Sequence, residues 1–192
     1  MDKERIIKLR ESFVKAENEI KRTETEFNEL PLPPINELRY SYNHFLRAIT
    51  TDNGSEDNFR SAEKHVLRSI YDAVDVRIVS SLELIKSFQD EFRDVSIVAV
   101  IPKWIDQLNK AREVKDYLSS NDDGETRQER LKDHLRYADD LKVICDTCEN
   151  SREELKKLID AKVVSYRRFV TTIAITVLGI LITIFLGILS LG

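Results

Sequence analysis

Residues 169–192 read FVTTIAITVLGILITIFLGILSLG and contain no Asp, Glu, Lys or Arg, although these four residue types make up 33% of the chain. As a helix, at roughly 1.5 Å per residue, this run is about 36 Å long, and the hydrocarbon core of a bilayer is about 30 Å thick. A buried helix of a soluble core is the alternative, but soluble domains rarely bury so many consecutive apolar residues. The run therefore predicts one transmembrane helix surrounded by membrane lipid.

The residues just before this run predict the orientation of the span. Basic residues tend to stay on the cytoplasmic side of a membrane. The flank contains Arg152, Lys156, Lys157, Lys162, Arg167 and Arg168, and no basic residue follows them. We therefore expect a single-pass protein of the cell inner membrane, with its N-terminal domain in the cytoplasm and almost no tail beyond the span.

The composition of the chain predicts an all-α fold. Only 5 Gly and 4 Pro occur among 192 residues, and strong helix formers are frequent throughout. The formal net charge of −4 argues against broad coating of nucleic acid, while a local basic patch remains compatible with it.

Apolar residues recur at three- and four-residue steps, which predicts a series of helices. We expect helices at residues 2–27, from near Asn36 to residue 50, at 59–92 and at 103–118, separated by a proline-rich stop at 30–34 and by polar loops at 51–58 and 119–126. Segment 94–102 is rich in β-branched residues but has no second strand to pair with. We interpret it as the start of a helix that Pro102 kinks or breaks.

Residues 127–166 contain neither Gly nor Pro and keep the same apolar spacing. This predicts one helix that continues into the span. The expected organisation is a cytoplasmic helical domain at 1–126, a helical stalk at 127–168 and a transmembrane helix at 169–192. A stalk of this length needs a partner surface, in the same chain or in another copy.

Small and hydroxylated residues follow one side of the predicted span. They are Thr172, Thr176, Gly179, Thr183, Gly187 and Ser190. Such residues let helices approach closely, or they line a water-filled pore when several copies surround one axis. Both interpretations imply a homo-oligomer, for example a tetramer. The span itself holds no fixed charge that would select ions strongly.

Two similar segments in the N-terminal half carry basic residues and histidines. The candidate ligand-binding residues are Arg39, His44, Arg47, Arg60, Lys64, His65 and Arg68. They would contact the phosphates of an anionic ligand, with nearby tyrosines stacking on bases. The alternative is that these side chains pair with the acidic residues Glu37, Glu63, Asp72 and Asp75 between packed helices.

The R-x4-H spacing of Arg39 with His44, and of Arg60 with His65, resembles the motif of HEPN-type ribonucleases. That resemblance implies an all-helical enzyme in which an Arg and a His act on an RNA phosphate and its 2′-hydroxyl. The sequence holds no Gly-rich phosphate loop, HExxH motif or nucleophile elbow. We therefore expect a protein that is not an enzyme, with the membrane-tethered ribonuclease as an alternative.

Cys145 and Cys148 form a C-x-x-C pair, but no second pair or nearby His completes a zinc site. Both positions fall near the apolar side of the long helix. We expect small core residues in a reducing compartment, and neither a metal nor a cofactor.

The layout of a small helical domain that leads into one C-terminal span resembles the membrane effectors of bacterial antiphage systems. Together with the segments LRYSYNHFLRAI and AEKHVLRSIYDA, it is similar to the channel-forming effector of the Hailong system. The resemblance implies an oligomeric helical cap and a nucleotidyltransferase partner. It also implies an oligonucleotide or single-stranded DNA signal that holds the channel closed until infection. A tail-anchored scaffold or adaptor is the alternative function.

Overall fold

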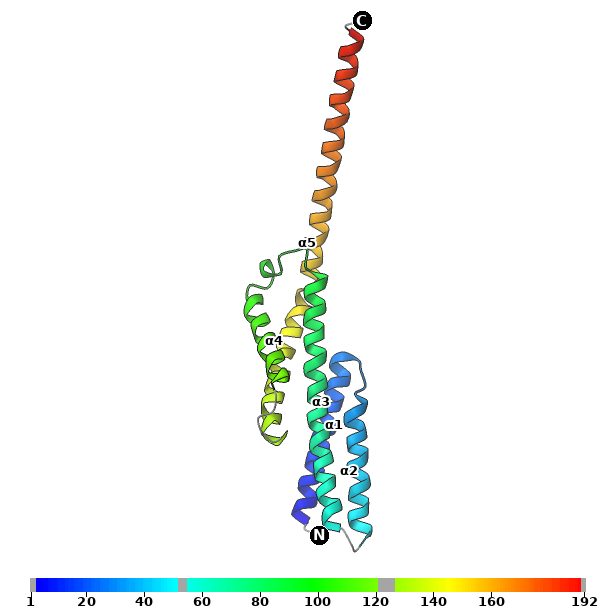
Figure 1. The fold of residues 1–192 in the computed structure, drawn as a ribbon, viewed down its shortest axis with the longest axis vertical. Helices are drawn as coiled ribbons and strands as arrows, with labels where there is room; N and C mark the ends of the chain where they lie inside the picture. Colours follow the sequence, from blue (N-terminus) through cyan, green and yellow to red (C-terminus); the bar gives the residue numbers. More distant parts are fainter. Residues whose placement is uncertain (1–2, 52–54, 121–126, 191–192) are drawn as a thin grey trace.

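The computed structural model describes residues 3–51, 55–120 and 127–190, with side chains described at 3–51, 55–120 and 129–183. Every regular element in these ranges is helical, which confirms the predicted all-α class (Figure 1). The elements are α1 (Lys3–Phe27), α2 (Leu32–Thr50), α3 (Ser55–Glu91), the short 3-10 helix η1 (Ile97–Ala99), α4 (Trp104–Ser119) and α5 (Arg127–Ser190).

Two helix starts differ from the prediction. Helix α2 begins at Leu32, before the expected start near Asn36, because Pro33 and Pro34 lie in its first turn, where a missing N–H costs no hydrogen bond. Helix α3 begins at Ser55, inside the expected loop, and Glu56 and Asp57 in its first turn favour the start of a helix. The segment after α3 forms the single 3-10 turn η1 rather than the start of α4.

Helix α3 is the central element, and the other long helices pack along it (Figure 1). Helices α1 and α2 cover its N-terminal half: Ser41 of α2 donates a hydrogen bond to the carbonyl of Ala62, and Thr23 of α1 donates one to the carbonyl of Ala73. Helices α4 and α5 cover its C-terminal half. The result is two three-helix bundles that share α3 end to end.

The core of the second bundle is aromatic and aliphatic. Phe88 of α3 packs against Trp104 of α4, with ring centroids 5.4 Å apart. From α5, Leu141, Cys148 and Leu155 are fully buried against this core. The first part of the predicted stalk is therefore part of the same core as α3 and α4, while the predicted division at residue 126 stays a prediction.

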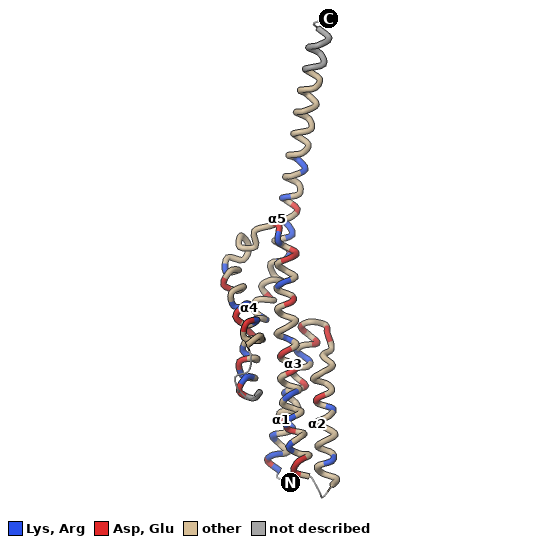
Figure 2. The backbone as a smooth tube through the Cα atoms, viewed as in Figure 1, with Lys and Arg blue, Asp and Glu red and all other residues tan. Residues whose placement is uncertain are grey.

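Beyond this core, α5 continues alone (Figure 1). Lys162 donates to the carbonyl of Asp94, and every described residue from 160 to 183 is exposed. Figure 2 shows that charged residues end before the last turns of this projecting part. Within the described residues, α5 is the one helix long and apolar enough to cross a membrane.

Candidate functional site

The structure divides the predicted ligand-binding residues between two flanks of α3. His44 of α2 and His65 of α3 lie together in the seam between these helices, with their rings stacked 5.2 Å apart. His65 Nδ1 lies 2.7 Å from a carboxylate oxygen of Glu37, and His44 Nδ1 lies 3.0 Å from the amide oxygen of Asn58. Part of this cluster therefore forms polar contacts between packed helices, as the ion-pairing alternative expected.

Arg60 and Lys64 lie on the other flank, in a groove of about 380 Å³ between α1 and α3. Lys8 and Ser12 of α1 complete its polar lining, and the sequence patterns had not singled out either residue. Glu63 also lines the groove, but its carboxylate accepts a 2.9 Å hydrogen bond from Arg5. Three cations thus reach one groove, where an anion would meet both helices.

The two R-x4-H pairs have different surroundings. Arg39 is exposed next to its neighbour Tyr40, 5.6 Å from the ring centroid. Arg60 lines the α1–α3 groove, whereas His65 faces α2, so the members of this pair point to opposite flanks. Arg47 and Arg68 are exposed. The structure thus brings together the two histidines and, separately, the pair Arg60 and Lys64.

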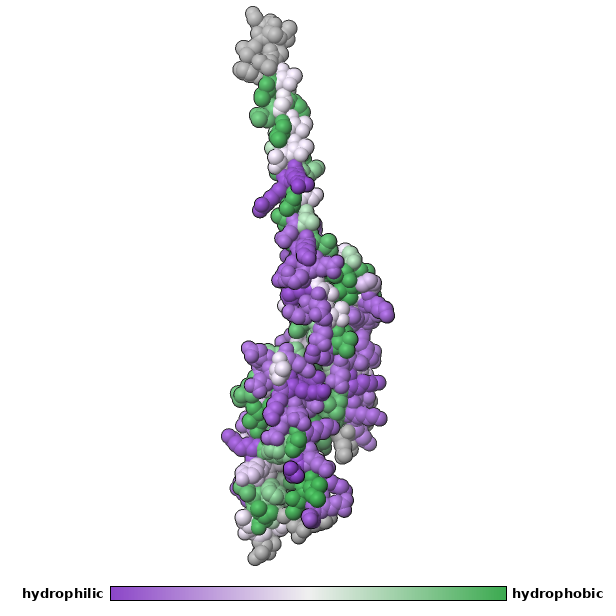
Figure 3. Space-filling view, turned by 180° about the vertical axis from the view of Figure 1, so that it is seen from behind, coloured by the Kyte–Doolittle hydropathy of each residue, from purple (hydrophilic) through white to green (hydrophobic). Residues whose placement is uncertain are grey.

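The small and hydroxylated residues of α5 lie on its projecting part, where pale side chains line one side and apolar ones the other (Figure 3). The Thr172, Thr176 and Thr183 hydroxyls each donate a 2.9 Å hydrogen bond to the carbonyl one turn earlier. A methyl group placed on Gly179 would meet no atom within 4 Å. We call Thr172, Thr176, Gly179 and Thr183 the threonine stripe; the side-chain positions of Gly187 and Ser190, predicted to extend it, lie outside the described residues.

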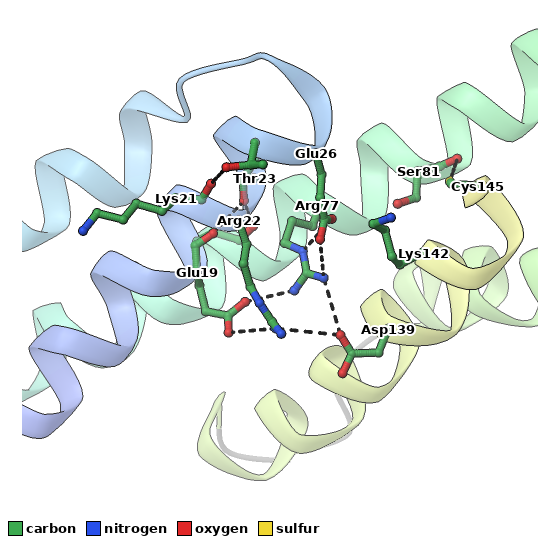
Figure 4. A network of polar contacts seen from close by, with 12 residues as sticks. Glu19, Lys21, Arg22, Thr23, Glu26, Arg77, Ser81, Asp139, Lys142 and Cys145 are labelled. Atoms are coloured by element: carbon green, nitrogen blue, oxygen red, sulfur yellow. Dashed lines mark hydrogen bonds and ion pairs between the residues drawn. The ribbon is translucent and has the colours of Figure 1, made fainter. Parts of the chain in front are cut away.

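Arg77 lies where α1, α3 and α5 meet and is only 2% exposed (Figure 4). Its guanidinium donates to Glu19 at 2.9 Å and to Glu26 at 3.2 and 3.3 Å. It also donates to Asp139 of α5 at 3.4 Å. Burial acts to lower the pKa of Arg77, but the carboxylates of Glu26, Glu19 and Asp139 outweigh it and raise the pKa. A permanent charge therefore ties α1 and α5 to α3.

His134 of α5 is completely buried among residues of three helices. Its Nδ1 lies 3.1 Å from the Arg130 carbonyl and 3.3 Å from the Tyr117 hydroxyl of α4. Its Nε2 has no hydrogen-bond partner and lies 3.8 Å from a carboxylate oxygen of Asp75. Burial lowers the pKa of this imidazole, although the Arg130 carbonyl and the Asp75 charge oppose the shift.

Sequence reasoning missed both Arg77 and His134. Their spacing indicates that both side chains are buried. Arg77 follows the buried Ala73 by four residues and His134 follows the buried Leu131 by three, so both lie on the apolar sides of their helices. A polar residue that continues an apolar spacing predicts a buried polar contact. Its partners come from other helices, and periodicity does not identify them.

The cysteines lie as predicted. Cys145 and Cys148 are buried free thiols, and burial raises the pKa of Cys145 to about 11 and that of Cys148 to about 12. Both thiols are therefore protonated and unreactive at neutral pH. Among the residues that the structure describes, no three His, Cys, Asp or Glu side chains form a group able to hold a metal ion.

Comparisons with protein-family models, with curated proteins and with solved structures gave no match for this chain.

Proposed function

We propose that several copies of this protein associate side by side in a membrane through α5 and form a pore. The observation that carries this proposal is the projecting part of α5, which is exposed at every described residue from 163 to 183 and carries the hydroxyl-bearing stripe there. A lone helix in lipid gains nothing from such a stripe, whereas a partner helix or a water-filled lumen does.

The bundles leave room for this arrangement. On an ideal helix the buried residues Leu141, Cys148 and Leu155 of α5 lie about 90° to 130° around the axis from the threonine stripe. Copies that turn their stripes toward a common axis would therefore carry their bundles on the outside. The bundles would then surround the base of the pore without crossing its axis.

The orientation and the control of the pore belong to the same proposal. The basic flank of the span favours bundles on the cytoplasmic side, and the protein would then lie in the inner membrane of a bacterial cell. An anionic ligand bound at the α1–α3 groove would shift the packing of α1, and Arg77 joins α1 directly to α5. The nucleotidyltransferase partner, the oligonucleotide signal and the antiphage role remain proposals that follow from the resemblance to Hailong effectors.

The pore is tested by ion flux from vesicles that contain purified full-length protein. We expect flux from the unchanged protein and a loss of most of it with Thr176→Leu and Thr183→Leu, because leucine would fill the lumen with apolar side chains. Thr171→Leu is the matched control: its hydroxyl makes the same bond to a carbonyl one turn earlier, but it lies about 110° from the stripe. Equal flux from all variants would refute the pore.

A tail-anchored scaffold is the second candidate function. It is favoured by an apolar groove of about 300 Å³ between α1 and α2, lined by Ile6, Phe13 and Phe45 among others. Hydroxyl groups bonded to their own helix backbone are also compatible with a simple anchor. A scaffold would keep its function when residues 169–192 are replaced by a polyleucine span, whereas a pore would lose it.

A further inference from the structure

We infer that the pore selects anions, and that Arg168 at its cytoplasmic mouth is the residue that determines this selectivity. This inference rests on the proposed pore and names the class of ion that it conducts.

Arg168 lies directly below the threonine stripe. The Thr172 hydroxyl donates a 2.9 Å hydrogen bond to the Arg168 carbonyl, so the arginine is one turn earlier on nearly the same side of α5. On an ideal helix Arg168 is about 50° from the centre of the stripe. Side chains of helices point toward the N-terminus, so this exposed guanidinium extends toward the cytoplasmic entrance.

Arg167 occupies a different side of the same helix turn. It is also exposed, but an ideal helix places it about 150° from the centre of the stripe. In an assembly with the stripes turned inward, Arg167 faces the lipid headgroups and Arg168 faces the entrance. Symmetry repeats this in every copy, which gives a ring of arginines at one level of the pore.

Along α5 itself, no acidic residue lies close to this ring. The sequence contains no Asp or Glu after Asp160, which lies about 12 Å below Arg168 and about 130° from the stripe. Glu154 lies on the stripe side of α5, but about 21 Å below Arg168. Both distances exceed the screening length of about 8 Å at physiological ionic strength. A ring of cations at a pore entrance favours anions.

The expected size of the effect follows from Coulomb's law. A unit charge about 8 Å from a pore axis changes the local concentration of a monovalent ion roughly twofold in water. It raises that of anions and lowers that of cations, so each arginine changes the chloride-to-potassium ratio by roughly fourfold before screening.

The test measures the reversal potential of full-length protein in planar bilayers with a potassium chloride gradient. We expect a chloride-to-potassium permeability ratio well above one. Arg168→Gln should lower this ratio at least about fourfold, Arg168→Lys should keep it, and Arg167→Gln should leave it unchanged despite the same loss of charge.

The outcomes separate the two proposals. Currents that are cation-selective, or an Arg168→Gln ratio equal to that of the unchanged protein, would overturn the anion selectivity and leave the pore intact. An equal loss of selectivity in Arg167→Gln would show that general surface charge, and not the position of Arg168, is responsible. No current from the unchanged protein would overturn the pore and, with it, this inference.

Discussion

His134 and Arg77 place polar groups where their helices otherwise bury apolar side chains. Arg77 donates hydrogen bonds to three carboxylates, two on α1 and one on α5. Its Nε, Nη1 and Nη2 atoms each have a partner. His134 is different, because its Nε2 faces Asp75 across 3.8 Å without a hydrogen bond. Burying a polar group without a partner costs free energy. His134 therefore lowers the stability of the junction of α3, α4 and α5, and protonation of its buried imidazole lowers it further.

Acidification should therefore destabilise the protein through His134. The pKa of this group is lowered in the folded state, so the unfolded chain takes up its proton first when the pH falls below about 6.5. We expect the free energy of unfolding of the full-length protein in detergent to decrease from pH 7.5 to 5.5. His134→Gln should flatten this dependence.

The groups that face the imidazole are Tyr71 and Asp75 of α3, Tyr117 of α4, and Arg130 and Asp133 of α5. Carboxyl groups with lowered pKa values, such as Glu56 beside Arg5, lose their contribution only below about pH 4.5. The chosen pH range thus excludes these carboxyl groups, and because His44 and His65 are the same in both proteins, the difference between the two slopes reports His134. A slope that is unchanged in His134→Gln would contradict the assignment.

Helix α3 holds together two bundles whose other helices make few contacts with one another. Helices α1 and α2 pack on its N-terminal half, and α4 and α5 on its C-terminal half. Arg77 lies at the overlap and contacts α1 and α5 at once (Figure 4). The stability of this junction should depend on the buried pair with Glu19 far more than on the exposed ion pairs around it.

Replacing Arg77 by methionine should lower the free energy of unfolding by about 3–5 kcal/mol, because it leaves a buried carboxylate without its partner. The matched control is Arg22→Gln. Arg22 also reaches Glu19 and Asp139, at 3.5 and 3.9 Å, but its side chain is 52% exposed, so the loss should stay below about 1 kcal/mol. Chemical denaturation in detergent measures both, and equal losses would exclude a special role for Arg77.

The whole molecule is elongated, with the bundles at one end and the bare helix α5 at the other (Figure 1). Among the described side chains of α5, Leu155 is the last buried one and Ile159 the last that packs against the core. The bundles thus complete their packing without the apolar run. The bundles and the candidate membrane span share one continuous helix, so a movement of α5 in the bundles would reach the span directly.

A chain that ends at residue 168 should therefore remain folded and helical, and should no longer associate with membranes. The full-length chain should float with vesicles in a density gradient, whereas the shortened chain should stay in solution with the circular dichroism of a helical protein. The shortened chain retains Arg167 and Arg168, which controls for electrostatic binding to anionic lipid. An unfolded or vesicle-bound fragment would contradict this division.

Local patterns in the sequence were sufficient for much of the fold. Apolar spacing predicted α1, α4 and the uninterrupted α5, and it also placed Cys145 and Cys148 in the core. The predicted start of α2 near Asn36 is wrong by a few residues, because the first turn of a helix tolerates the prolines that precede Asn36. The candidate ligand residues were identified as a single cluster, which the structure divides between two flanks of α3.

The helical class, the long final helix and the apolar run that suits a membrane could all be predicted, because each depends on residues close together in the chain. Three features follow instead from how the helices pack: α3 joins two bundles, Arg77 pairs with Glu19, Glu26 and Asp139, and His134 faces Asp75. These contacts join residues far apart in sequence. Their partners are fixed by the packing of helices against one another, which the spacing along a single helix does not encode.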